Sequence, residues 1–323
     1  MAKSNVDYIP GLDLEEKSRA AREALRIKID FEAEPNKLDF ILPGLLVGTV
    51  GEIIAPGASG KSFWLLQAAL SIASGENLAG FQVDKSGEVL YINLEDPTEI
   101  VQNRIISMGT LLHKEAREKA IINTSIVDMR GEMIDIINDK HLDIIIKMSY
   151  GVRLIIIDTL SRIHTADENK NGEMAGVVSR LEKIAKETGA AVLIAHHANK
   201  MSQLDDLKEN QAASRGASAL VDNARFVCYI NKMSEKNCSD YMDGFGNSVK
   251  KEDAFKYVKY GISKQNYGEP VAGQWFRRGE GGILLPTQIY EKGEERAESK
   301  ADKKGNAYAK ATGKGGNDDE EIW

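Results

Sequence analysis

The stretch Ala55-Pro-Gly-Ala-Ser-Gly-Lys-Ser62 holds the residues best suited to chemistry, and it lies between an apolar run and a helical pattern. Gly57 and Gly60 allow positive φ and let the backbone approach phosphate oxygens without a Cβ in the way. The N–H groups that begin a helix form an anion site, which the helix dipole reinforces. Lys61 would bridge the β- and γ-phosphates, and Ser62 would place its hydroxyl on Mg²⁺. We therefore predict a site for a nucleoside triphosphate with Mg²⁺.

The whole loop contributes to this predicted nucleotide site. Its members are Pro56, Gly57, Ala58, Ser59, Gly60, Lys61, Ser62 and Phe63. The usual first glycine of such a loop is replaced by Ala55, and the outer turn tolerates a small residue better than the inner turn does. A chance glycine turn before a helix is the alternative. The coincidence of Gly-Lys-Ser with a strand before it and a helix after it argues against that alternative.

Acidic residues follow two other strand-like runs. Residues 87–95 are apolar on both faces, as in a central parallel strand, and end on Glu95-Asp96. Residues 153–158 have four apolar residues before a terminal aspartate, which is the Walker B pattern. Open α/β sheets carry their chemistry at the carboxyl ends of such strands. We therefore expect Asp158, together with Ser62, to hold the Mg²⁺ shell.

Two histidines end the strand-like run 190–197. No other His or Cys has ligand spacing around His196 and His197, which disfavours a metal site. At this position in a sheet, a polar side chain can touch the γ-phosphate and report its loss to the next loop. That loop, residues 198–211, has no apolar period and carries Lys200 and Lys208, which makes it a candidate mobile binding loop.

Helices and strands must position these residues. Apolar spacing predicts helices at 63–73, 98–109 and 174–186, a mainly helical region at 111–150, and strands at 50–55, 87–95, 153–160, 190–197, 226–231, 254–263 and 282–285. Thr98 or Asp96 would cap the second helix. The polar stretch 161–172 is predicted to be a mobile loop.

The composition is ordinary for a soluble globular protein, with 42% hydrophobic and 28% charged residues. A formal charge of −7 argues against a basic coat for nucleic acid, although a local basic channel remains compatible with it. Cys228 and Cys238 lack metal or redox spacing, which favours a reducing compartment. No apolar run approaches the length of a membrane span, so we expect a cytoplasmic protein without membrane contact.

We predict three parts of the chain. Residues 1–36 form an arm whose helix-like stretch has a thin apolar face, so that it docks either on its own subunit or on a neighbour. Residues 37–290 form the core. Residues 291–323 are rich in charge and poor in large apolar residues, which predicts a disordered tail. Its acidic tip, Asp318–Trp323, is either a solvated end or a docking site for replication partners.

With these elements assembled, the chain resembles the RecA/DnaB class of P-loop ATPases and, more narrowly, the RepA-type hexameric replicative DNA helicases of plasmids and phages. The resemblance spans roughly residues 38–286. It rests on Val47-Gly-Thr-Val-Gly51, Pro56-Gly-Ala-Ser-Gly-Lys-Ser62, Leu94-Glu-Asp-Pro97, Ile157-Asp-Thr-Leu160, His196-His-Ala198, Ala213-Ser-Arg-Gly216, Leu220-Val-Asp-Asn-Ala-Arg225, Ser263-Lys-Gln-Asn-Tyr-Gly-Glu-Pro270 and Trp275-Phe-Arg-Arg-Gly-Glu-Gly-Gly-Ile-Leu284. It implies an α/β fold, a RecA-like core with a mostly parallel twisted sheet flanked by helices and antiparallel strands added at the C-terminal edge.

The resemblance also implies roles for matching residues near the phosphate loop. Glu95 would be the general base that aligns the attacking water, and Asp96 would support it. His197 would sense the γ-phosphate at the position where RecA-class proteins carry a glutamine.

Other matching residues would reach the nucleotide of a neighbouring subunit. Arg225 is the preferred arginine finger and Arg215 the second candidate. Lys264 also matches a position from which such proteins reach the nucleotide of a neighbour. The DnaB-type motif Lys-Gln-Arg is replaced here by Lys264-Gln265-Asn266. Asn266 cannot supply a cation, so Lys264 would have to serve in that turn.

The activity implied by the resemblance is that of a ring-shaped, hexameric, ATP-driven 5′→3′ DNA helicase. Loops after Asp158 and His197 would grip single-stranded DNA by charge and backbone N–H groups. A RecA-class ATPase that does not unwind, such as a recombination mediator or a helicase loader, would share every nucleotide-site residue, and it stays open. A metabolic P-loop kinase is disfavoured because nothing resembles an acceptor-binding lid.

Overall fold

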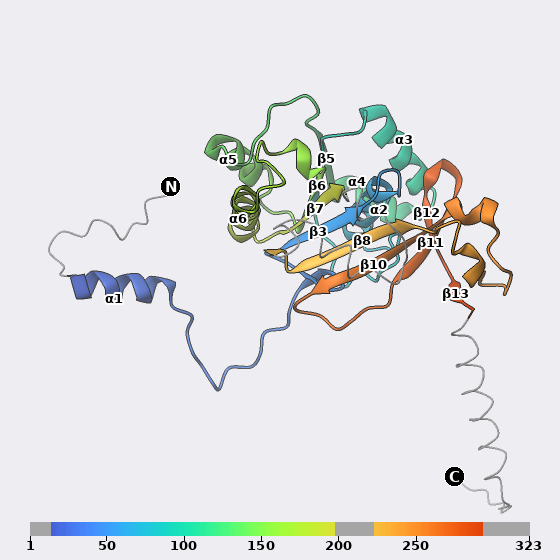
Figure 1. The fold of residues 1–323 in the computed structure, drawn as a ribbon. Coiled ribbons are helices and arrows are strands. Elements are labelled where there is room, and N and C mark those ends of the chain that lie inside the picture. Colours follow the sequence, from blue (N-terminus) through green and yellow to red (C-terminus); the bar gives the residue numbers. More distant parts are fainter. Residues whose placement is uncertain (1–13, 198–222, 293–323) are drawn as a thin grey trace, which may run out of the picture. The chain divides into compact units, whose positions relative to one another are not determined.

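The structure, a computed structural model, describes residues 14–197 and 223–292 (Figure 1). The chain divides into two units, residues 1–38 and 39–323. The described part of the first unit contains helix α1 (Leu14–Leu25), with acidic residues in its first turn and a basic residue in its last, the order that a helix dipole favours. Several predicted functional residues lie outside the described ranges, namely Lys200, Lys208, Arg215 and the acidic tip 318–323.

Among the described residues, a nine-stranded sheet forms the centre of the second unit, in the order β12-β11-β10-β8-β3-β7-β6-β4-β5. Its strands are β3 (Val50–Ala55), β4 (Val89–Asn93), β5 (Thr124–Asp128), β6 (Leu154–Asp158), β7 (Ala191–His197), β8 (Phe226–Lys232), β10 (Tyr257–Gln265), β11 (Gln274–Arg278) and β12 (Leu284–Thr287). The strands from β8 to β5 are parallel, whereas β10, β11 and β12 extend the sheet with antiparallel pairing. The predicted α/β class, with a mostly parallel sheet and added antiparallel strands, is confirmed.

Helices cover both faces of this sheet (Figure 1). On one face lie α2 (Lys61–Ser74), α3 (Thr98–Gly109) and α4 (Lys114–Asn123), and on the other lie α5 (Asp139–Met148) and α6 (Asn171–Thr188). Successive residues of a strand point to opposite faces of the sheet. Leu154 and Ile156 therefore pack in the hydrophobic core beneath α2, α3 and α4, whereas Ile155 and Ile157 pack in the core beneath α5 and α6. The central strands are therefore apolar on both sides.

Smaller elements complete the described structure. They are the pair β1 (Phe40–Leu42) and β2 (Leu45–Leu46), the pair β9 (Tyr241–Asp243) and β13 (Ile289–Glu291), and the short helices η1 (Leu160–Arg162), η3 (Cys238–Asp240), η4 (Lys251–Lys256) and η5 (Glu280–Gly282). Within the described residues, none of the helices combines the length and the apolar character that a membrane crossing requires.

Helix α2 ties the phosphate loop to the antiparallel end of the sheet. Nearly all its side chains are buried, and the ring of Trp64 stacks on Tyr260 of β10 with centroids 4.4 Å apart. Gln67 is fully buried, donates to the carbonyl oxygens of Leu78 and Leu284, and accepts from the Leu284 N–H. A buried amide with these three bonds fixes the position of β12 against the helix.

Three local predictions differ from the structure. The region 111–150 is not mainly helical, because residues 124–128 form an edge strand paired with β4 and α5 begins only at Asp139. Helix α3 has no side-chain cap, since Thr98 donates to Asp128 instead. The polar stretch 161–172, predicted to be a mobile loop, begins in η1 and ends in α6, and it buries Ile163 and His164.

We expect Gln67→Ala to lower the free energy of unfolding by about 3 kcal/mol, because it leaves buried backbone groups of Leu78 and Leu284 without partners. Gln102→Ala, at an exposed position of α3, is the control and should change it by less than about 0.5 kcal/mol. Urea denaturation followed by circular dichroism measures both. Equal stability of the two variants would show that the Gln67 bonds do not hold β12.

Candidate active site

The predicted phosphate loop leads from the carboxyl end of β3 into α2. Gly60 has φ 103° and Ala58 φ 56°, so the loop uses the left-handed region twice. Only Ser59 lies between these two residues in sequence. The N–H of Trp64 donates to the Gly60 carbonyl at 3.0 Å, and this is the first hydrogen bond of the helix. The free N–H groups of the first helical turn are therefore those that begin at Lys61, as an anion site requires.

A buried ion pair joins this loop to the end of β6. The Lys61 ammonium lies 3.3 Å from Asp158 Oδ1, and both side chains are almost fully buried. Tyr91 of β4 donates its hydroxyl to Asp158 Oδ2 at 2.7 Å. Thr159 donates to the Ala195 carbonyl of β7, and its hydroxyl lies 3.5 Å from the Lys61 ammonium. The two residues predicted for phosphate and metal thus meet where β4, β6 and β7 end.

The donor set fits a magnesium–nucleotide complex. Asp158 Oδ1 and Ser59 Oγ are buried and have no hydrogen-bond partner in the described structure. Gly57 has open space where a Cβ would lie, so the backbone there can be approached closely. The Ser62 hydroxyl and the Asp158 carboxylate are oxygen ligands of the kind that Mg²⁺ prefers.

Glu95 and His197 also come together at this edge. Glu95 follows β4 and His197 ends β7, and the His197 Nε2 lies 3.4 Å from Glu95 Oε2. Their side chains are 39% and 42% exposed, so both remain open to a ligand and to water. The predicted base and the predicted phosphate sensor therefore contact each other directly.

Asp96, the predicted support of Glu95, contacts helix α3 in this structure. It forms an ion pair with Arg104 of α3, and the Arg104 guanidinium lies 4.5 Å from the centroid of the Phe63 ring. The Asp96 backbone is held by Asn93 in both directions. Asp96 thus anchors a cation beside the first turn of α2, a contact that the sequence prediction missed.

Arg278, at the end of β11, was also missed. Its Nη2 donates to the carbonyl oxygens of Ala58 and Ser59, at 3.2 and 2.6 Å. The N–H and C=O of a trans peptide point in opposite directions, so holding the Ser59 carbonyl directs the Gly60 N–H away from Arg278. Arg278 therefore orients the loop from the antiparallel end of the sheet.

Arg225 and Lys264 lie at the other end of the parallel strands, where β3 and β8 begin. Phe226 pairs with Gly51 near the start of β3, and Lys264 pairs with Val227. The six residues of β3 separate that end from the phosphate loop by about 20 Å, since a strand rises about 3.3 Å per residue. Neither cation can reach the loop of its own chain.

Comparison with known proteins decides the family. Residues 16–203, more than half of the chain, match the AAA domain family. The chain belongs to the AAA domain family. Membership implies nucleotide binding at the loop described above.

Solved structures share the fold of this AAA domain protein at low sequence identity. A DnaB-like replicative helicase, described with its interactions with primase, is 16% identical with a TM-score of 0.56, over 83% of this chain and 70% of that one. A second solved structure, which is an ATPase domain, is 15% identical with a TM-score of 0.51, over 84% and 98%. The RadB recombinase is 15% identical with a TM-score of 0.46, over 74% and 91%. The sheet order and the two structures with TM-scores above 0.5 show that this AAA domain protein has a RecA-like fold.

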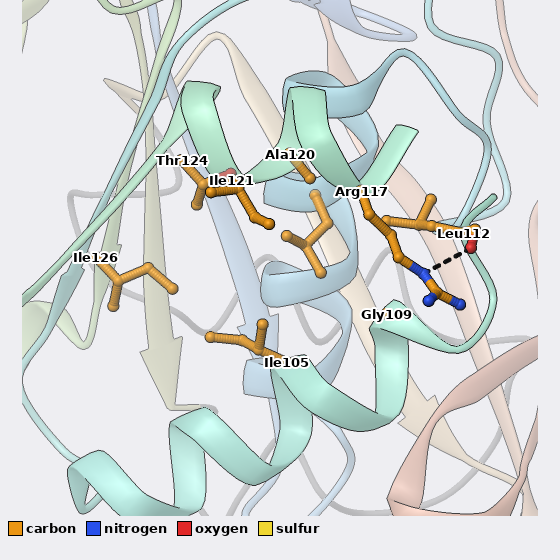
Figure 2. A pocket seen from close by; sticks show the side chains of 9 residues that line it. Ile105, Gly109, Leu112, Arg117, Ala120, Ile121, Thr124 and Ile126 are labelled. Atoms are coloured by element: carbon orange, nitrogen blue, oxygen red, sulfur yellow. Dashed lines mark hydrogen bonds between the residues drawn. The ribbon is translucent and has the colours of Figure 1, made fainter. Parts of the chain in front are cut away.

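A separate cavity of about 380 Å³ lies between α3, α4 and β5 in this AAA domain protein (Figure 2). Apolar side chains, including Ile105, Ile121 and Ile126, point into it, and Arg117 Nε donates to the Leu112 carbonyl at its rim. No residue of the phosphate loop lines it, so it is distinct from the nucleotide site.

We expect Arg278→Ala to weaken ATP binding by about tenfold, because the loop loses two charge-assisted hydrogen bonds that orient it. Arg277→Ala is the matched control, since Arg277 is the exposed neighbour on the other face of β11. Titration with a fluorescent ATP analogue measures both affinities. If the two variants bind equally well, Arg278 has no part in forming the site.

Proposed function

We propose that this protein is a ring-forming, ATP-dependent replicative DNA helicase of the RepA type, a hexamer that moves 5′→3′ on single-stranded DNA. The observation that carries the proposal is the opposite position of the phosphate loop and of Arg225 on one sheet. A nucleotide site that needs the Arg225 cation must take it from a second copy. Head-to-tail contacts of this kind close into rings when the rotation allows.

In the proposed reaction, Glu95 accepts a proton from the attacking water. His197, which contacts Glu95, also contacts the γ-phosphate. Lys61 binds the β- and γ-phosphates. Ser62 and Asp158 would hold Mg²⁺, which when bound neutralises charge on the phosphate oxygens. Arg225 of the neighbouring copy stabilises charge that develops in the transition state, with Arg215 as the other candidate and Lys264 assisting.

Asp158 and His197 lie at the same end of the sheet as the phosphate loop, which supports the proposed role of the segments that follow them in gripping single-stranded DNA. Lys200 and Lys208 follow His197 in sequence, and their contact with DNA phosphates is part of the proposal. We propose further that the arm of residues 1–36 assists assembly and that the acidic tip of the 291–323 tail recruits replication partners. The core of 37–290 carries hydrolysis.

A RecA-class ATPase that hydrolyses ATP without unwinding is the second candidate. The described nucleotide site serves it equally well. Displacement of an annealed strand distinguishes the two functions.

We expect the rate of ATP hydrolysis per subunit to rise with protein concentration and again when single-stranded DNA is added, because the active site is shared between copies and coupled to a strand. A phosphate-release assay from nanomolar to micromolar protein, with and without oligo(dT), measures it, and Lys61→Ala gives the background. A rate that ignores both variables would contradict the helicase and indicate a self-contained switch. Stimulation by DNA without strand displacement would favour the second candidate.

The shared site has its own test. Glu95→Gln and Arg225→Ala subunits, each inactive alone, should regain activity when mixed, because some interfaces then combine an intact Glu95 with an intact Arg225. Random mixing at equal amounts makes about a quarter of the head-to-tail interfaces complete.

The matched control mixes Glu95→Gln with Lys61→Ala. Both changes damage the part of the site that one subunit supplies, so an interface with an intact pair needs a wild-type subunit, and none is present. Activity in this mixture equal to that of the first mixture, or absent from both, would show that Arg225 does not act across an interface.

A further inference from the structure

Four ionisable side chains form a cluster on the sheet face that α5 and α6 cover, opposite the phosphate-loop helix. Glu52 of β3 is fully buried, and His196 of β7 donates from Nδ1 to Glu52 Oε1 at 2.7 Å. The other ring nitrogen of His196 lies 3.6 Å from Glu168 Oε2. Glu168 Oε1 lies 3.9 Å from the Nε2 of the buried His164. Glu168 and His164 belong to the segment 163–170, which joins η1 to α6.

The two histidines of this cluster differ in charge at neutral pH. Burial disfavours a charged His196 ring, but Glu168 and Glu52 outweigh that effect and raise the pKa of His196 to about 9. His196 therefore carries a positive charge at neutral pH between two carboxylates. Burial lowers the pKa of His164, which is neutral there. Among the described residues no three His, Cys, Asp or Glu side chains are grouped so that they could hold a metal ion.

His196 is covalently adjacent to His197 and points to the other face of β7, because successive strand residues alternate. His197 contacts Glu95 at the nucleotide edge, whereas His196 contacts Glu168 of the segment that follows β6. A displacement of the end of β7 therefore moves both contacts together. Glu168 is the outer member of the cluster, with its side chain 37% exposed, and its ion pair with His196 bridges β7 to a connecting segment rather than to another strand.

We propose that the ion pair between His196 and Glu168 couples the state of the nucleotide to the segment 163–170. When His197 contacts the γ-phosphate, the end of β7 takes one position, and the segment follows through Glu168. When the γ-phosphate is lost, the end of β7 relaxes and the segment moves with it. Glu168 is thus a positioning residue, which acts on neither the nucleotide nor the attacking water.

The anchoring of the segment makes this coupling effective. Ile163 is fully buried and its carbonyl accepts from the Ile136 N–H, which fixes the beginning of the segment. Near its end, Glu173 of α6 accepts from the Asp167 N–H at 2.8 Å. Glu168 directly follows the second anchored residue, Asp167, and its side chain is held to β7 by charge. At a partly buried position this attraction exceeds that of an exposed pair, so a shift of β7 changes its energy appreciably.

Glu168→Gln tests the coupling, because it removes the charge and keeps the size of a half-exposed side chain. His196→Gln is less suitable, since it leaves Glu52 buried without its partner and endangers folding. Glu173→Gln is the matched control: it alters a carboxylate that holds the same segment and does not contact His196. Hydrogen exchange of residues 160–170 is measured in the presence of Mg²⁺, once with a non-hydrolysable ATP analogue and once with ADP, and the two results are compared.

We expect the wild-type protein to show different exchange in this segment with the two nucleotides. Glu168→Gln should lose that difference while its affinity for both nucleotides stays within about twofold of wild type. Glu173→Gln should keep the difference, even if its exchange is faster with both nucleotides. The proposal is overturned if the wild type shows no difference, if Glu168→Gln keeps it or loses nucleotide binding, or if Glu173→Gln loses it equally.

The role of this coupling in DNA movement rests on the proposed function, but the exchange experiment needs no DNA. With DNA present, Glu168→Gln should also lose stimulation of hydrolysis while keeping its basal rate. A wild-type protein that DNA does not stimulate would contradict the helicase alone. Loss of the exchange difference in Glu168→Gln would still support the coupling in that case.

Discussion

The parallel pairing of β3, β7, β6 and β4 is the constraint on which the rest of the structure depends. Parallel strands run in the same direction, so their carboxyl ends meet at one edge, and the phosphate loop, Glu95, Asp158 and His197 lie together for that reason. Strands covered on both faces must be apolar along most of their length. Any charge buried in such a sheet therefore needs a close partner to offset its loss of water.

Two buried ion pairs near this edge meet that requirement on opposite faces. Lys61 and Asp158 pair on the face of α2, and Glu52 and His196 pair on the face of α6. Apolar contacts have no preferred direction. A buried ion pair needs its partner in place, because removing one partner costs about 3–5 kcal/mol. Such pairs therefore fix how the strands and the helix are aligned at this end of the sheet. The edge is therefore held most firmly where phosphate chemistry depends on position.

Local pattern predicted the elements that carry the loop and its acidic neighbours. β3, β4, β6 and β7 are short apolar runs ending in polar residues, and α2 follows glycine with apolar spacing, so each is encoded within its own residues. β5 is different, because Thr124–Asp128 continues an apolar helical pattern and becomes a strand only by pairing with β4. Thr98 likewise leaves its expected capping role for Asp128, a partner 30 residues away.

Most of the missed site residues act across the chain. Arg278 reaches Ser59 over 219 positions, and no spacing rule indicates such a contact. Glu52 left a detectable signal: it is a lone carboxylate inside an apolar strand, and a buried carboxylate requires a cation. His196 was the available partner, since it follows by two residues the Ile194 that pairs with Glu52 and so shares its face. Treating the two histidines as one unit concealed that adjacent strand residues face opposite sides.

The antiparallel strands place cationic side chains at both ends of the sheet. β10 runs antiparallel to β8 and carries Lys264 to the end of the sheet where Arg225 immediately precedes β8, while β11 returns and brings Arg278 to the phosphate loop. One hairpin thus supplies a cation to its own loop and another to the far end. Because hydrogen-bonded strands connect the two ends rigidly, a loop oriented by Arg278 is tied in position to the cations about 20 Å away. Under the proposed head-to-tail assembly, closing one nucleotide site would therefore also move the cations offered to the next.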